Sequence, residues 1–275
     1  MLRMLLVGFF ALGSGLVSAD CIRVTGDLTQ GAWLRFEGDA IHRVDWNKQP
    51  LTLVDGRLSW VGLSREAPLE NQLRVEFDSG EVCLQSVTLS KREYNVSIIE
   101  GVPQRTVTPP QEDLERIRKE RAQVAAAKAT VYDCVECIEE LLFAIQMPVT
   151  GRISGVYGSQ RVYNGVPGNP HYGLDIARPT GTPVKAPSRG MVVLAEPDLY
   201  YSGGTVILHH GFGVTSSFLH MSRLHVKAGD VVEQGGLIGE VGATGRATGP
   251  HLDWRMNHEL NRVDPNTLFR LVSEP

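Results

Sequence analysis

Length, composition and charge exclude several classes of protein. The chain has 275 residues, 42% hydrophobic and 21% charged, which is ordinary for a folded protein with room for one or two hydrophobic cores. A formal net charge of -4 argues against nucleic-acid binding, which usually requires a basic patch or stripe. The same composition argues against extensive disorder.

The N-terminus has the three parts of a secretory signal. Arg3 supplies a positive charge, residues 4–17 are almost free of polar side chains, and the small residues Ser18 and Ala19 follow. The apolar stretch is shorter than the roughly 20 residues of a membrane span. We therefore expect a signal peptide over residues 1–19, export to the periplasm or cell envelope, and no stable membrane span after processing. An uncleaved anchor is the alternative.

Export would place the four cysteines in an oxidising compartment. Cys134 and Cys137 form a Cys-x-x-Cys pair, which alone is weak evidence for redox chemistry or for metal, since zinc would need two further ligands. A local disulfide is the favoured interpretation, with Cys21 and Cys83 as the complementary pair. Four cysteines allow three pairings, so the sequence leaves the choice open.

Residues 20–107 predict a small antiparallel β domain. Short alternating runs recur along this segment, and Asp55-Gly56 and Ser79-Gly80 are turn signals. Pro109-Pro110 ends the region. The candidate strands are Ala32–Phe36, Arg57–Val61, Leu73–Phe77 and Val82–Val87.

Residues 111–146 predict a helical linker, as one long helix or two shorter ones. The segment 111–144 contains no glycine or proline, and Glu115 and Lys119 can pair at i,i+4 spacing. Its charges are expected to form a solvated helix face, not a binding patch.

Residues 148–275 are glycine-rich and predict a β-sandwich-like domain, so the expected fold class is mainly β. Strand candidates alternate with glycine turns at the spacing of a compact sheet. These candidates are Gly190–Leu194, Gly204–Leu208, Val214–Leu219 and Leu237–Val241.

Histidines are concentrated in this C-terminal segment, which raises the possibility of a metal site. A catalytic zinc ion uses three protein ligands and keeps a position open for water. His171-x-x-x-Asp175 alone is weak evidence, because packing could explain both residues. His251 and Asp253 are more informative, since positions i and i+2 of a strand face the same side. His209 and His225 receive no role, and His42 and His258 are expected at the surface.

The segment Asn169–Ala177 resembles the start of the lysostaphin-type zinc endopeptidase domain, and the resemblance extends over about residues 148–269. It is specific because several motifs occur in the same order. Those that follow are Gly181–Val184, Ala186-Pro187, His210–Gly213, Phe218–Ser222, Val226–Asp230 and Gly245–Trp254. More loosely, Arg92–Asn95 and Gly101–Pro103 resemble the N-terminal domain of some exported bacterial members.

The resemblance implies a role for each matching residue. His171 and Asp175 match the first two zinc ligands, and His220 and His251 match the two catalytic histidines. The third ligand is usually a histidine, but Asp253 occupies its position in this chain. We expect zinc binding to be retained, because a carboxylate oxygen binds zinc at about the same distance as an imidazole nitrogen. His210 is a secondary candidate ligand.

The resulting expectation is a zinc-dependent endopeptidase that hydrolyses peptide cross-links of bacterial peptidoglycan, with the peptide stems as partner and any regulatory adaptor left open. The alternative is a non-catalytic peptidoglycan-binding regulator of another hydrolase. Asp253 supports that alternative, whereas the presence of the other matching residues opposes it. Leu199-Tyr200-Tyr201 is interpreted either as a wall of the substrate groove or as a loop anchor.

Overall fold

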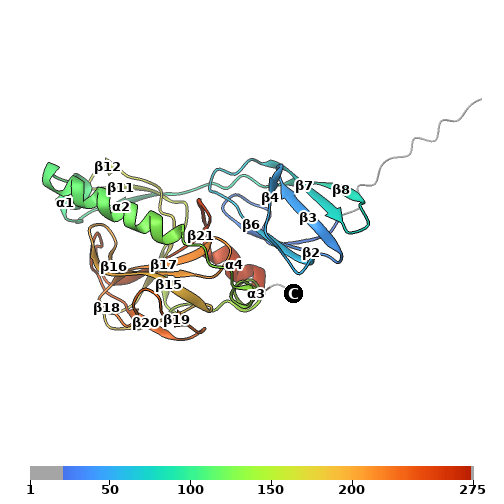
Figure 1. The fold of residues 1–275 in the computed structure, drawn as a ribbon. Helices are drawn as coiled ribbons and strands as arrows, with labels where there is room; N and C mark the ends of the chain where they lie inside the picture. The colour runs from blue at the N-terminus through green and yellow to red at the C-terminus, as the bar shows by residue number, and fades with distance from the viewer. Residues whose placement is uncertain (1–20, 274–275) are drawn as a thin grey trace, which may run out of the picture.

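The computed structural model describes residues 21–273 and is mainly β (Figure 1). The expected signal peptide over residues 1–19 lies outside the described residues. None of the helices in the described part of the chain combines the length and hydropathy that a bilayer span requires. An N-terminal pair of sheets lies beside a larger C-terminal sheet, and the helices pack against the latter (Figure 1).

The N-terminal strands form two four-stranded antiparallel sheets, in the orders β1-β2-β6-β5 and β4-β3-β7-β8. All four predicted strands of this region are confirmed, with small shifts in their ends. Asp55 and Gly56 both have positive φ, as the tight turn before β6 requires. The strands are β1 (Arg23–Thr25), β2 (Trp33–Glu37), β3 (Ile41–Trp46), β4 (Gln49–Pro50), β5 (Leu53–Val54), β6 (Leu58–Gly62), β7 (Glu70–Phe77) and β8 (Val82–Thr88).

The C-terminal region is built on an eight-stranded sheet. Seven strands follow the order β10-β13-β21-β17-β16-β15-β19, and β22 pairs with β21. The predicted strands of this region are confirmed. The strands are β10 (Arg152–Gly155), β13 (Leu174–Ala177), β15 (Gly190–Leu199), β16 (Gly203–His209), β17 (Val214–Met221), β19 (Val231–Val232), β21 (His251–His258) and β22 (Asn261–Val263).

Two three-stranded sheets complete the β structure. One has the order β14-β20-β18, and the other has the order β12-β11-β9. In the second, β9 runs parallel to β11, so a strand from the N-terminal half joins the C-terminal half. The strands are β9 (Val96–Ile99), β11 (Gln160–Tyr163), β12 (Val166–Pro167), β14 (Pro183–Lys185), β18 (Arg223–Leu224) and β20 (Leu237–Glu240).

The predicted helical segment forms two helices that differ in burial. The first, α2 (Leu114–Lys128), is polar and buries only Ile117. The second, α3 (Val135–Ala144), buries Ile138, Leu141 and Leu142, whose i, i+3, i+4 spacing makes one apolar face. Thus only α2 behaves as a solvated linker. The other helical elements are α1 (Gln104–Val107), the 3-10 turn η1 (Gln111–Asp113) and α4 (Pro265–Ser273).

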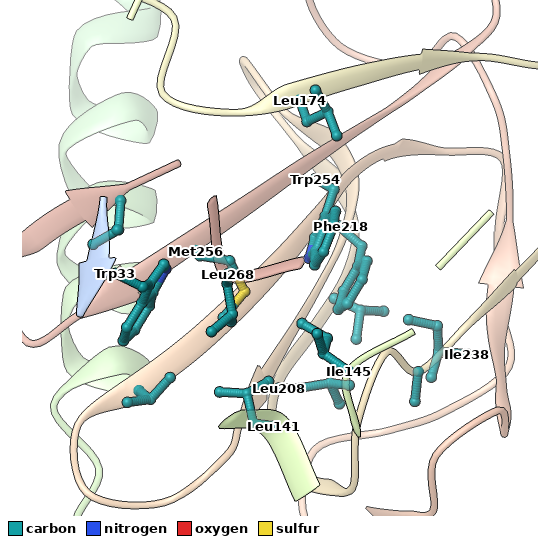
Figure 2. Packing of buried hydrophobic residues seen from close by; sticks show 14 of the residues in the cluster. Trp33, Leu141, Ile145, Leu174, Leu208, Phe218, Ile238, Trp254, Met256 and Leu268 are labelled. Carbon is teal, nitrogen blue, oxygen red and sulfur yellow. The ribbon is translucent and has the colours of Figure 1, made fainter. Parts of the chain in front are cut away.

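One hydrophobic core connects the N-terminal sheets with the C-terminal sheet. Trp33 of β2 and Trp60 of β6 belong to the same buried cluster as Trp254 of β21 and Leu268 of α4. Figure 2 shows Trp33 beside Met256 and Leu268 in this cluster. A second core lies within the N-terminal sheets alone. The C-terminal sheet therefore depends on side chains from the first 60 residues for part of its packing.

The expectation that His258 lies at the surface is wrong. This residue is 7% exposed, and its ring packs against Trp33 and Trp60 with centroids 5.8 and 6.5 Å away. Its Nδ1 accepts a hydrogen bond of 3.0 Å from the Gly62 N–H. A side chain on Gly62 would collide with His258, so glycine permits this close contact. The error arose because Trp33 and Trp60, which cover His258, come from the N-terminal sheets and meet it only in the tertiary structure.

Acid is expected to destabilise the protein through His258. Burial lowers the pKa of His258 to about 4, below the ordinary value near 6.5. The unfolded chain therefore binds more protons, so this stability is complete above about pH 6.5 and is lost as the pH falls towards 4. Urea titrations at pH 7.5 and 4.5 should show a contribution of about 2–3 kcal/mol, at 1.36 kcal/mol for each pKa unit.

The matched variant is His258→Asn, whose Oδ1 occupies the position of Nδ1 and can accept the Gly62 hydrogen bond without titrating. It should show a smaller loss of unfolding free energy between the two pH values than the parent chain. An identical pH dependence in both proteins would exclude His258 as the cause.

The four cysteines lie at disulfide distance in the pairing favoured from the sequence. Cys21 and Cys83 have Cα atoms 5.7 Å apart, and Cys134 and Cys137 have Cα atoms 5.3 Å apart. The first pair closes the N-terminal sheets, and the second lies at the start of α3. The Cys-x-x-Cys pair therefore lies at the N-terminus of α3. Neither of its cysteines belongs to the histidine–aspartate group described below.

Candidate metal centre

Two neighbouring strands bring three metal-binding side chains together. In the antiparallel pair β13–β21, Asp175 lies directly opposite Asp253. His171 precedes β13, and its side chain returns to the same face. His171, Asp175 and Asp253 are all buried and each offers one ligand atom, all within 4.8 Å of one another. The register of one strand pair thus joins the His171–Asp175 motif to Asp253, 78 residues later.

The donor atoms of this group fit a small divalent cation. His171 Nε2 lies 3.1 Å from Asp175 Oδ1, close to the edge of about 3.3 Å of a zinc tetrahedron with bonds of about 2.0–2.1 Å. Both atoms are buried without a hydrogen-bond partner in the described structure. Buried polar atoms normally have partners, so unsatisfied atoms at this point indicate room for a ligand. A nitrogen and carboxylate oxygens form a donor set that suits zinc.

Two arginines hold the carboxylates. Arg255 lies on the same face of β21 as Asp253, and its guanidinium contacts both carboxylate oxygens, at 2.5 Å for Nη2 to Oδ2. Arg161 of β11 donates to Asp175 Oδ2 at 2.5 Å, which leaves Asp175 Oδ1 towards His171. Partners of this kind orient the carboxylates that bind a metal.

The arginines also keep the carboxylates ionised. Burial by itself would raise the pKa of Asp253, but Arg255 and His171 outweigh burial and hold that pKa far below its usual range. The pKa of Asp175 is also lowered: burial and Asp253 act to raise it, and His171 and Arg161 outweigh them. Deprotonated carboxylates are the form that binds a cation.

Two glycines make room for the carboxylates. A Cβ atom on Gly155 of β10 would collide with Asp175 Oδ2, and one on Gly173 would collide with Asp253 Oδ1. Any larger residue would push the carboxylates from their present positions. These glycines therefore belong to the architecture of the site, although they have no chemical group to contribute.

His220 of β17 and His251 of β21 form a second layer beside the three buried residues, with ring centroids 4.8 Å apart. His220 Nδ1 lies 2.8 Å from the Thr244 carbonyl, and His251 Nδ1 lies 2.8 Å from the Gly249 carbonyl. A carbonyl only accepts, so both Nδ1 atoms carry a proton and the neutral rings have a free Nε2 lone pair. His251 Nε2 lies 3.8 Å from Asp175 Oδ1.

The backbone and environment of His220 are also unusual. Its φ is 65°, a left-handed conformation that non-glycine residues rarely adopt, and such strain is concentrated at functional sites. Burial lowers the pKa of His220 to about 4, although Asp253 opposes the shift. The ring is therefore neutral at physiological pH and able to accept a proton.

The other histidines of this region lie outside the group. His210, the secondary candidate ligand, uses Nδ1 on the Arg189 carbonyl at 2.8 Å and Nε2 on Ser216 Oγ at 2.7 Å, so both nitrogens are engaged elsewhere. His209 accepts from the Gly211 N–H, and His225 pairs with Glu240. His210 therefore has a structural role.

The structure brings together the five site residues predicted from the sequence, which are His171, Asp175, His220, His251 and Asp253. Arg161 and Arg255 were not predicted. Arg255 could have been found, because it continues the i, i+2 series of Asp253 along one strand face. Arg161 gave no local signal, since β11 reaches Asp175 only through the tertiary fold.

Comparisons with known proteins match the region of the chain that holds this site. The model of "Peptidase family M23" matches residues 169–265. Peptidoglycan DD-endopeptidase ShyA of Vibrio cholerae is 42% identical over 87 residues, which are 32% of this chain and 20% of that protein. Lysostaphin of Staphylococcus simulans is 41% identical over 92 residues, 33% of this chain and 19% of that protein. The matched part thus spans about a fifth of these relatives.

A solved structure covers much more of the chain. It is from Pseudomonas aeruginosa and carries the designation peptidase M23, with 31% identity and a TM-score of 0.64. The alignment covers 88% of this chain and 94% of that one. The likeness therefore includes the N-terminal sheets as well as the region that holds the site.

Proposed function

The chain belongs to peptidase family M23, and on this premise we propose that it is a zinc-dependent endopeptidase that hydrolyses peptide cross-links of bacterial peptidoglycan. The substrate class follows the printed activities of two relatives, a peptidoglycan DD-endopeptidase and lysostaphin. The supporting observation is the buried group of His171, Asp175 and Asp253, in which His171 Nε2 and Asp175 Oδ1 have no hydrogen-bond partner within the described structure.

We assign His171, Asp175 and Asp253 as the residues that hold the metal. Zinc bound there supplies Lewis acidity, which polarises a peptide carbonyl and makes a water molecule more acidic. Arg161 and Arg255 keep the two carboxylates in position and ionised. The substitution of Asp253 for the usual histidine is therefore compatible with metal binding, since its added negative charge is matched by Arg255.

We assign proton transfer during hydrolysis to His220 and His251. Each ring has its Nδ1 proton bound to a carbonyl, so each presents Nε2 for exchange with the reacting groups. One of the two histidines accepts a proton of the attacking water at Nε2, and the protonated ring then donates that proton to the nitrogen of the leaving amine. Their close spacing allows both to act on one tetrahedral centre.

We propose that the protein acts after export, in the periplasm or cell envelope. The N-terminal signal pattern and the two cysteine pairs at disulfide distance support an oxidising compartment. The relatives named for activity on peptidoglycan agree with this location.

Metal content and cleavage together test the proposed function. The purified mature chain should contain about one zinc ion and should release muropeptides from cross-linked peptidoglycan. A chelator should stop release, and added zinc should restore it. A metal-free protein that binds cell wall without cleaving it would contradict the proposal and would fit the non-catalytic alternative.

A further inference from the structure

A cavity of about 970 Å³ lies between α2 and the face of the sheet that carries the candidate metal centre. Helix α2 packs on that face lightly, through Val124 and Ala127 against a cluster that includes Leu199 and Ile207. Figure 1 shows α2 lying beside β16 and β17. Since few side chains fill the space beneath it, the helix forms a roof over the sheet.

The cavity adjoins the candidate metal centre. Its wall includes Leu219 of β17, which lies opposite Asp253 in the β17–β21 pair. Its wall also includes Arg255, whose guanidinium contacts the Asp253 carboxylate. Arg255 therefore separates the cavity from the buried Asp253 carboxylate and belongs to both the cavity wall and the metal centre.

Two basic residues of the cavity lining lie near Asn257. Lys128 Nζ, at the end of α2, donates to Asn257 Oδ1 at 2.7 Å, and Arg262 lies opposite Asn257 on β22. Among residues 21–273, no carboxylate forms an ion pair with Lys128 or Arg262. Burial, with Arg255 and Arg262 nearby, lowers the pKa of Lys128 to about 7. An anion bound beside these cations would relieve their repulsion.

The acidic residues of the lining do not neutralise this cluster. Glu120 is already bound by Arg116 at 2.6 Å and by the Tyr200 N–H at 2.8 Å. Asp133 and Glu259 are exposed, as is Arg262, and neither carboxylate pairs with Lys128 in the described chain. Lys128 is thus a cavity-lining amine without a carboxylate partner in the described chain, while Leu199, Ile207 and Leu219 provide apolar walls.

We propose that this cavity binds a free carboxylate of the peptide substrate, with Lys128 as the main cation and Arg262 beside it. This inference rests on the proposed function, because it assigns the cavity to the same substrate. Asn257 lies four residues after Asp253 on β21, or ~13 Å along the strand. An extended peptide covers that distance in about four residues. The carboxylate would thus lie about four residues from the scissile bond.

A short peptide fits these features better than a simple anion. The lining combines apolar side chains with the basic side chains of Lys128 and Arg262. These properties suit an extended chain of small aliphatic residues with a terminal or side-chain carboxylate. In this proposal α2 has a binding function, because it holds Lys128 towards the sheet.

Two probes that differ only in charge test the inference. Calorimetry should compare Ala-Ala-Ala-Ala with a free C-terminus and the same peptide as its C-terminal amide, both with the full mature chain in chelator. The free acid should bind at least about tenfold more tightly, the size of one charge-assisted hydrogen bond. Lys128→Met should abolish the difference, and Lys128→Arg should retain most of it.

Lys119→Met is the matched control, because Lys119 lies on the same helix but is exposed and pairs with Glu115. It should leave both affinities unchanged, and thermal melting should show that all variants are folded. Equal binding of acid and amide by the parent chain would overturn the inference, as would an unchanged preference in Lys128→Met. Inorganic phosphate that displaces the peptide with equal affinity would also overturn it, since the site would then be a simple anion site.

The two proposals can fail separately. Peptide binding is measured without metal or turnover, so a preference for the free acid would stand even if no muropeptide were released. Conversely, the enzyme could cleave peptidoglycan with a KM that Lys128→Met leaves unchanged. That result would overturn the carboxylate site and leave the proposed function intact.

Discussion

Replacing Asp253 with alanine is expected to lower zinc affinity by more than about 100-fold and to abolish peptide hydrolysis. Loss of a residue that only hydrogen-bonds to a metal ligand typically lowers metal affinity by about 10–100-fold, so loss of a ligand itself should cost more. The change removes a buried ligand and also leaves the Arg255 cation unpaired beside the remaining residues. Competition with a fluorescent zinc chelator measures the affinity directly, independently of turnover.

Asp253→His is the matched variant for this prediction. It places a histidine, the usual third ligand of the resembling family, at the same strand position. Because a third ligand is restored, this variant should bind zinc at least about tenfold more tightly than Asp253→Ala. Zinc affinity in Asp253→Ala equal to that of the parent chain would show that Asp253 does not bind the metal. The third ligand would then have to be sought elsewhere.

Replacing His251 with alanine should lower kcat by about 10²–10⁴-fold, the usual contribution of general acid–base catalysis, while zinc content stays close to that of the parent chain. The His251 ring is oriented by the Gly249 carbonyl, and its free Nε2 lies 3.8 Å from Asp175 Oδ1. It is thus near the metal-binding residues without belonging to their group. Steady-state kinetics and metal analysis of the same sample make the measurement.

His225→Ala is the control for this variant, because His225 pairs with Glu240 away from the site. It should leave both kcat and zinc content unchanged. A loss of zinc in His251→Ala as large as the loss of activity would mean that His251 binds the metal, and the division of roles among the site residues would need revision.

The site could be predicted from sequence where strand alternation or a motif fixed the geometry. His251 and Asp253 face the same side because they are two residues apart in a strand. The short spacing of His171 and Asp175 also restricts their separation. The pairing of Asp175 with Asp253 could not be predicted from alternation, because it depends on which strands become neighbours and in which register.

Local sequence was enough to predict most strands, the turns and the helical segment, because these depend on side-chain alternation and on glycine. It did not predict that α3 is buried while α2 forms a roof, or that Trp33, Trp60 and His258 meet in one core. Those features depend on contacts between residues far apart in the chain. The same holds for Arg161 at Asp175 and for Lys128 facing Asn257. The residue types of the candidate site could thus be predicted from the sequence. The arginines that balance its carboxylates, and the position of α2 over the sheet, arise only when distant strands and helices pack together.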